Sequence, residues 1–148
     1  MELDKFFLEL GLDSFSRTLN DYLGANSPTN YHREILKGLF DEFPQFRIKT
    51  KIYRASRTGK SHSRELRNKF VAGCRCLKDV KSFIEKRQDK GYDYILESRE
   101  EIDCFDLHAF IKTINEKYGN RITERYQDEK EIIFQFKFPY DWLIVRKV

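Results

Sequence analysis

The first 45 residues carry apolar side chains at the spacing of amphipathic helices. Three stripes repeat at intervals of three and four residues, which is the pattern of one buried helix face. They consist of Leu3, Phe6, Phe7 and Leu10; of Phe15, Leu19, Tyr22 and Leu23; and of Ile35, Leu36, Leu39, Phe40 and Phe43. Because Gly11, Gly24 and Pro44 follow the stripes and Ser14 can cap the second, we predict three helices with these limits.

From residue 46 the pattern changes to an alternation of period two. Phe46, Ile48 and Ile52 alternate with polar residues and Tyr53, which predicts a half-buried strand. Residues 54–69 follow as a basic loop and the start of a helix. The apolar run 70–72 then leads into a helix that closes near Gly91 and whose apolar face comprises Val80, Phe83 and Ile84.

The C-terminal part is predicted to contain more strands. Residues 92–96 read as a strand, and a helix capped by Asp106 ends at Gly119, with Leu107, Phe110, Ile111, Ile114 and Tyr118 on its apolar face. Strands are predicted over 132–138 and 142–145. We therefore predict a single α+β domain over 1–148, with a helical N-terminal part (1–45) and a mostly antiparallel, sheet-rich part (46–148).

Composition agrees with one folded domain. The chain is 40% hydrophobic and 15% aromatic, which disfavours disorder, and its thirteen Phe and eight Tyr predict a core built largely on aromatic packing. The net charge of +4 permits contacts with a nucleic acid or a dinucleotide but does not require them.

The cysteines and the N-terminus bear on the cellular compartment. Cys74, Cys76 and Cys104 are odd in number and lack zinc-ligand spacing, so we expect reduced thiols and no metal. The N-terminus lacks the basic and apolar regions of a signal peptide, and no stretch reaches the roughly 18 apolar residues of a membrane span. These features predict a cytoplasmic protein that does not use a membrane.

Two local patterns carry candidate chemistry. Tyr53 and Arg54 lie at the end of the predicted strand, and Glu129 and Glu131 run directly into the strand that begins at Ile132. A guanidinium forks onto phosphate oxygens, and a fixed carboxylate stabilises positive charge that develops on a ribose. Either pattern alone is common, since Glu101-Ile102-Asp103 has the same acid-x-acid spacing.

Taken in order, these segments resemble the ADP-ribosyltransferase superfamily, in its arginine-serine-glutamate class of bacterial toxins and phage enzymes. The resemblance runs from about residue 15 to the end. Its motifs are the Asn-x-x-Leu helix at 19–23, the aromatic-Arg strand at 52–54, the Phe-x-Ser-Thr-Ser segment at 70–74, the strands at 94–97 and 102–107, and the Glu-x-Glu segment at 126–133, with the closing strand near Val145.

The resemblance implies a two-sheet core and transfer of ADP-ribose from NAD, used as a substrate, to a protein side chain, arginine above all. It assigns Glu131 to a ribose hydroxyl and the developing cation, and Glu129 to the incoming nucleophile. Because Gln127 precedes Glu129 by two residues, a slipped register remains an alternative.

The resemblance also assigns a binding role to Arg54. Arg54 would bind the NAD phosphates, helped by Arg57 or Lys60, and Tyr53 and Phe70 would pack against a ring of the dinucleotide. Cys74 would line the same site. The expected setting is a bacterial or phage-infected cytoplasm, with a host protein as a candidate acceptor.

One segment departs from the family pattern, because Ala72, Gly73 and Cys74 occupy the Ser-Thr-Ser positions. Alanine has no hydroxyl to support the ribose, and a thiol is a weak hydrogen-bonding group. Three alternatives follow: another serine (Ser56, Ser61 or Ser63) replaces the missing one, the site is weakened, or the activity is lost.

Two other functions remain open on the sequence. A degenerate transferase domain would serve as a protein-binding module. Alternatively, the basic run 54–69 would bind nucleic acid or a host nucleic-acid enzyme, although a solvated charged face is the commonest explanation of such runs.

Overall fold

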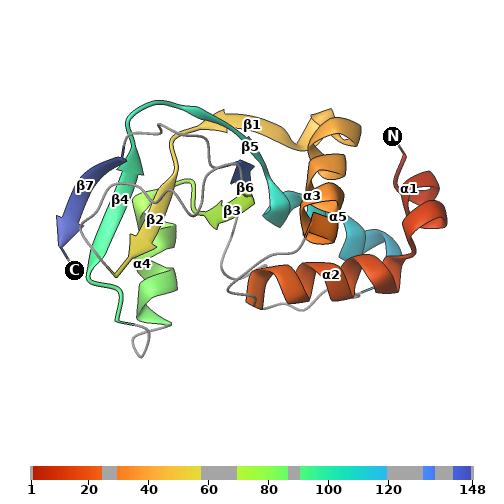
Figure 1. Cartoon of the computed structure of the whole chain (residues 1–148), viewed down its shortest axis with the longest axis horizontal. Helices are drawn as coiled ribbons and strands as arrows, with labels where there is room; N and C mark the ends of the chain where they lie inside the picture. The colour runs from red at the N-terminus through yellow and green to blue at the C-terminus, as the bar shows by residue number, and fades with distance from the viewer. Residues whose placement is uncertain are drawn as a thin grey trace.

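The structure is a computed structural model, and it describes residues 2–24, 30–57, 70–86, 91–119, 132–135 and 142–147 (Figure 1). Its helices are α1 (Leu3–Leu10), α2 (Leu12–Gly24), α3 (Asn30–Glu42), α4 (Leu77–Glu85) and α5 (Leu107–Tyr118), with a short 3-10 helix, η1 (Pro44–Phe46). Its strands are β1 (Arg47–Thr50), β2 (Tyr53–Ser56), β3 (Phe70–Gly73), β4 (Tyr94–Ser98), β5 (Ile102–Phe105), β6 (Ile132–Gln135) and β7 (Trp142–Lys147). The expected α+β class is confirmed.

The strands form two small sheets in which the paired strands are antiparallel. One has the order β1-β5-β6-β3 and the other the order β2-β4-β7. Two stretches of chain run through both sheets: residues 47–56 supply β1 and β2, and residues 94–105 supply β4 and β5. The sheets are therefore joined by a pair of bent strands, which Figure 1 shows changing direction between β1 and β2.

The bend follows from unequal lengths of chain. Thr50 pairs with Ile102 and Tyr53 with Glu97, so two residues on one side, Lys51 and Ile52, face the four residues 98–101 on the other. Ser98 is buried at this mismatch and forms the hydrogen bonds that the interrupted ladder lacks. Its Oγ accepts the Ile52 N–H at 3.0 Å and donates to the Glu100 carbonyl at 2.8 Å, while the Ser98 N–H donates to the Ile52 carbonyl at 2.9 Å.

We predict that Ser98→Ala destabilises the protein by about 1–3 kcal/mol, because the buried Ile52 N–H loses its acceptor. The measurement is the free energy of unfolding in urea. Thr50→Ala is the matched control, since the Thr50 hydroxyl bonds only to the adjacent Lys51 carbonyl and is exposed. Equal stability of Ser98→Ala and Thr50→Ala would contradict the role given to Ser98.

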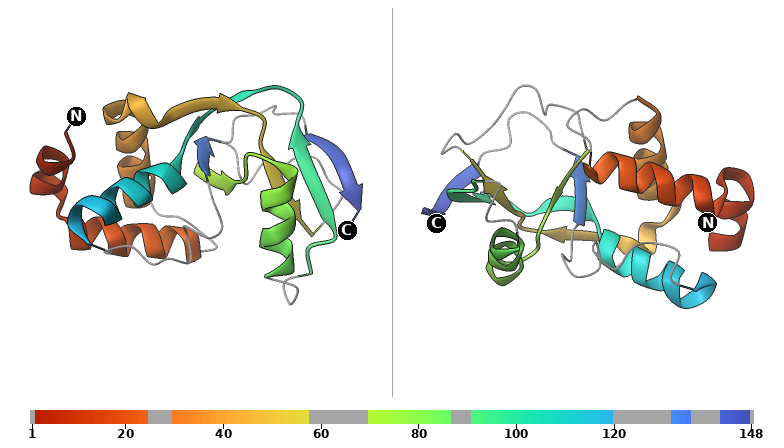
Figure 2. Two further views of the ribbon diagram at one scale, coloured as in Figure 1. Left: turned by 180° about the vertical axis from the view of Figure 1, so that it is seen from behind. Right: turned by 90° about the horizontal axis from the view of Figure 1, so that it is seen from below.

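The larger core lies at the helical end and is aromatic, as the composition predicted. Phe110 of α5 is its centre, with ring centroids 5.0 Å from Phe43, 5.3 Å from Phe105 and 5.9 Å from Phe15. Leucine and isoleucine side chains of α3 and α5 fill the remaining space. Both views in Figure 2 place α1, α2, α3 and α5 together at this end, away from α4 and β7.

A smaller core lies between α4 and the three-stranded sheet. Val80 and Ile84 of α4 pack with Cys74 and with Ile95 of β4, and Tyr53 and Ala55 of β2 border them. The two cores lie on either side of the bend. Among the described residues, no helix is long and apolar enough to cross a lipid bilayer.

Asp106 links the two ends of the molecule. As predicted it caps α5, where its Oδ1 accepts the Ala109 N–H at 3.0 Å, and its Oδ2 lies 3.3 Å from Nη1 of Arg75, which precedes α4. Half of the Arg75 side chain is exposed, so the ion pair contributes little. The hydrogen bond that caps α5 is therefore the larger contribution of Asp106 to stability.

We therefore expect Asp106→Ala to cost about 1 kcal/mol of unfolding free energy. Asp106→Asn keeps the capping oxygen and removes the charge, so it should cost less than about 0.5 kcal/mol. Urea unfolding of the two variants distinguishes the contributions. An Asn variant as unstable as the Ala variant would show that the ion pair, not the cap, stabilises this junction.

Helix α1 is attached to α5 by a polar cluster. The Tyr118 hydroxyl donates to Asp4, and Nζ of Lys117 lies 3.2 Å from Oδ2 of the same carboxylate. The hydrogen bond from Tyr118, followed by that from Lys117, lowers the pKa of Asp4 below its usual 3.8. The stability that this shift provides is complete above pH 3.8 and is lost as the pH falls through the folded-state pKa.

We predict that Tyr118→Phe moves the pKa of Asp4 up towards 3.8, and that Lys117→Gln moves it less. Carboxyl chemical shifts followed by NMR over an acid titration measure both changes. The reverse order of the two effects would mean that the lysine charge, not the tyrosine hydroxyl, holds the carboxylate.

Several predicted boundaries are corrected by the structure. Ser14 is not the cap of the second helix, because α2 begins at Leu12, directly after Gly11 with its positive φ of 86°. The strand predicted from 46 is two strands, and residues 54–56 belong to β2 rather than to a basic loop. α4 ends at Glu85, before Gly91. Local periodicity does not show where pairing with a distant strand ends.

Candidate functional site

Two of the residues predicted to bind a dinucleotide, Tyr53 and Cys74, meet through their backbones where the two sheets join. The Tyr53 N–H donates to the Cys74 carbonyl at 2.8 Å, and the Cys74 N–H donates to the Tyr53 carbonyl at 2.9 Å. This bridge connects β2 of one sheet to the chain that leaves β3 of the other. The segment of Tyr53 and Arg54 is thus joined to the distant segment of Cys74 through the backbone of Tyr53.

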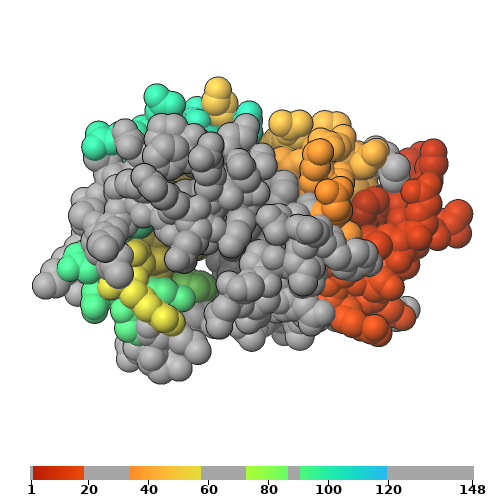
Figure 3. Space-filling model, viewed as in Figure 1, coloured from red at the N-terminus to blue at the C-terminus, as the bar shows by residue number. Residues whose placement is uncertain are grey.

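Arg54 lies on the face of β2 opposite α4. Tyr53 and Ala55 border the core under α4, and since side chains alternate along a strand, Arg54 and Ser56 share the other face. Arg54 pairs with Leu96 of β4, and both Arg54 and Ser56 are half-buried. Figure 3 shows residues of β2, in yellow, at the surface of the molecule. Of the three serines considered as replacements for the missing one, the structure describes Ser56, which lies on the same face of β2 as Arg54.

Cys74 contributes to the candidate site through its backbone and not through its thiol. Its side chain is 3% exposed and packs with Val80, Ile84 and Ile95, so the thiol is part of the core rather than of an open surface. No disulfide joins the three cysteines, all of which lie among the described residues. Cys76 is exposed at the start of α4, whereas burial, followed by the charge of Asp103, raises the pKa of Cys104 to about 12.

Glu97 is a residue that the sequence analysis did not identify. It lies directly opposite Tyr53 in the β2–β4 pair, and its Oε1 accepts the Tyr53 hydroxyl proton at 2.6 Å. This hydrogen bond, followed by burial, raises the pKa of Tyr53 to about 12. No local signal identifies this partner, because the two residues are 44 positions apart and meet only through the strand register.

β6, which follows the predicted carboxylates Glu129 and Glu131 in the chain, adjoins the same junction. β6 pairs with β3, with Ile132 opposite Gly73 and Ile133 opposite Ala72. Phe70, predicted to contact a ring of NAD, begins β3 and pairs with Gln135. Glu129 and Glu131 lie outside the described residues, as do Lys60, Ser61 and Ser63.

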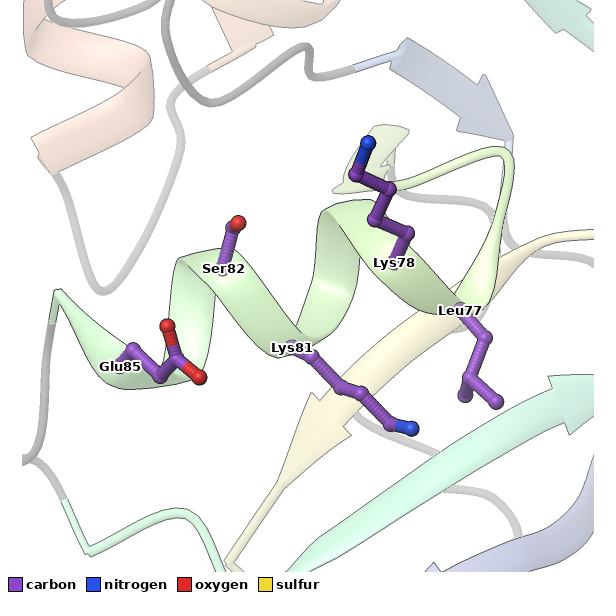
Figure 4. A pocket seen from close by; sticks show the side chains of 5 residues that line it. All are labelled: Leu77, Lys78, Lys81, Ser82 and Glu85. Carbon is purple, nitrogen blue, oxygen red and sulfur yellow. The ribbon is translucent and has the colours of Figure 1, made fainter.

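A shallow hollow lies elsewhere, over the outer face of α4 (Figure 4). Its described lining residues all belong to that helix: Leu77, Lys78, Lys81, Ser82 and Glu85. Lys78 and Lys81 point in different directions in Figure 4, so their ammonium groups do not converge on one ligand. None of the predicted site residues that the structure describes lines this hollow.

Within the described parts of the chain, no group of three or more histidine, cysteine or acidic side chains is placed to hold a metal ion. Comparisons of the chain with known protein families, with curated proteins and with solved structures give no significant match. The interpretation of the site therefore depends on its own residues and geometry.

Proposed function

We propose that this protein is an ADP-ribosyltransferase that transfers ADP-ribose from NAD to a protein side chain, arginine above all. The observation that supports this function best is the convergence of three distant segments at the sheet junction. Arg54 follows Tyr53 in the chain, and the backbone of Tyr53 bonds to that of Cys74. Gly73, the residue before Cys74, pairs with Ile132 of β6. Ile132 in turn directly follows Glu131 in the chain. The strand that carries the proposed cation is thus linked, through Cys74 and Gly73, to the strand that directly follows the proposed carboxylate in the chain.

Arg54 is the proposed phosphate ligand. Its guanidinium is permanently charged and presents a planar fork to two phosphate oxygens. The half-buried position on β2 supports this role, because partial removal from water strengthens an interaction between charges. Ser56, on the same face of the strand, is the proposed replacement for the hydroxyl that Ala72 lacks.

Glu131 is the proposed catalytic carboxylate. Cleavage of the bond between nicotinamide and ribose builds positive charge on the sugar, and a fixed negative group stabilises that transition state more than the ground state. Glu129, two residues earlier, would orient and deprotonate the acceptor, to which the ribose carbon forms its new bond as nicotinamide leaves.

A second candidate is a transferase-like domain that binds a protein partner without catalysis. The burial of the Cys74 thiol favours it, because the segment 72–74 then offers no exposed hydroxyl or thiol in place of the Ser-Thr-Ser motif. Nothing in the described residues favours the nucleic-acid alternative, since most of the basic run 54–69 lies outside them.

The decisive experiment is incorporation of label from radiolabelled NAD into proteins of a bacterial lysate. We expect discrete labelled bands, sensitive to chemistry that cleaves arginine linkages. Glu131→Gln should reduce the rate by roughly 10²–10³. Arg54→Lys, which keeps the charge but not the fork, should raise KM for NAD about tenfold.

Two matched controls accompany these variants. Glu101→Gln removes an exposed acid from the other acid-x-acid pair that enters a strand, and Arg47→Lys changes an exposed arginine on β1. Both should retain native activity. Binding of NAD without labelling would favour the non-catalytic candidate, and absence of both would refute the proposed function.

A further inference from the structure

We propose that Glu97 is a positioning residue for Arg54: through its hydrogen bond with the Tyr53 hydroxyl, it holds the strand that carries Arg54 at the sheet junction. The inference rests on the proposed function, since it concerns how Arg54 meets the phosphates of NAD. Glu97 itself need not touch the dinucleotide.

The need for such a residue follows from the place of β2 in its sheet. β2 is an edge strand, with β4 on one side. On the other side, among the described residues, the single bridge from Tyr53 to Cys74 holds it. All four residues of β2 pair with β4, but a strand at the edge of a sheet still opens more readily than a central one. Because Arg54 directly follows Tyr53, contacts that fix Tyr53 also help to position Arg54.

Tyr53 is the residue of β2 on which these contacts converge. Its N–H and carbonyl bond to Cys74, and its hydroxyl bonds to Glu97 at 2.6 Å. A hydrogen bond to a carboxylate is shorter and stronger than one between neutral groups. The Tyr53 hydroxyl is protonated and can donate at neutral pH, since its pKa of about 12, like the usual value of 10, lies far above 7. Backbone and side chain thus fix one residue from two directions.

Arg54 is the next residue in the chain and projects from the opposite face. A small shift or rotation of β2 would turn its guanidinium away from paired phosphate oxygens. The phosphates do not react, so they are bound alike in the ground state and the transition state. Loosening Arg54 should therefore raise KM and leave kcat nearly unchanged.

A double-mutant cycle in the full-length protein tests the inference, with Tyr53→Phe, Glu97→Ala and the double variant. We expect each single variant to raise KM and the NAD dissociation constant roughly three- to thirtyfold, with kcat within about twofold. The double variant should be no worse than the singles, because all three lack the same bond. Glu97→Gln, which keeps an acceptor oxygen, should restore most of the NAD affinity.

The chain offers a matched control for loss of a tyrosine–carboxylate bond. Tyr118 donates to Asp4 between α5 and α1, and burial, followed by this hydrogen bond, raises the pKa of Tyr118 to about 12. Tyr118→Phe should leave KM unchanged. A purely structural role of the Tyr53 bond would instead lower the thermal midpoint without changing KM.

A spectroscopic measurement tests the bond without any activity. In alkaline titration followed by tyrosinate absorbance, Glu97→Gln should lower the pKa of Tyr53 from about 12 towards its usual 10. If wild-type protein binds no NAD, the proposed function fails and this inference fails with it. If wild-type protein binds NAD but the cycle is additive, or KM does not change, the positioning role alone is refuted.

Discussion

The bend between the two sheets is the constraint on which the rest of the structure depends. At the bend, Lys51 and Ile52 of one stretch of chain face the four residues 98–101 of the other. The ladder therefore cannot continue straight, and the buried Ile52 would be left with an unpaired N–H. The Ser98 hydroxyl accepts a hydrogen bond from this N–H and donates one to the Glu100 carbonyl. A buried polar group with two partners thus permits one pair of strands to enter two sheets.

Each side of the bend has its own apolar core. At the helical end, phenylalanine rings from α1, α2, α5 and β5 meet mostly edge to face, an arrangement that stabilises beyond burial alone. At the other end, α4 covers β2 and β4. The ion pair between Arg75 and Asp106 runs between these parts but is half exposed and contributes little to stability.

The candidate site lies at this junction because three sets of contacts meet there. The Tyr53–Cys74 bridge connects the sheets, the β3–β6 ladder brings Ile132 to Gly73, and Glu97 holds the Tyr53 ring. Residues far apart in the chain are brought together by pairing, while the strand alternation assigns Arg54 and Tyr53 to opposite faces. Cys74, whose thiol lies in the core, therefore contributes to the site only through its backbone bonds with Tyr53.

Local patterns in the sequence determined the helices, the aromatic core, the cap at Asp106 and the stop at Gly119, because each depends on residues within a few turns of one another. The family resemblance pointed to Arg54, Tyr53 and Cys74, but not to the backbone bridge between Tyr53 and Cys74. Only the tertiary structure decided the division of residues 46–56 into two strands, the burial of the Cys74 thiol and the pairing of Tyr53 with Glu97. The physical reason is register: which residue lies opposite another depends on how distant strands pair, and periodicity within either strand does not contain that information.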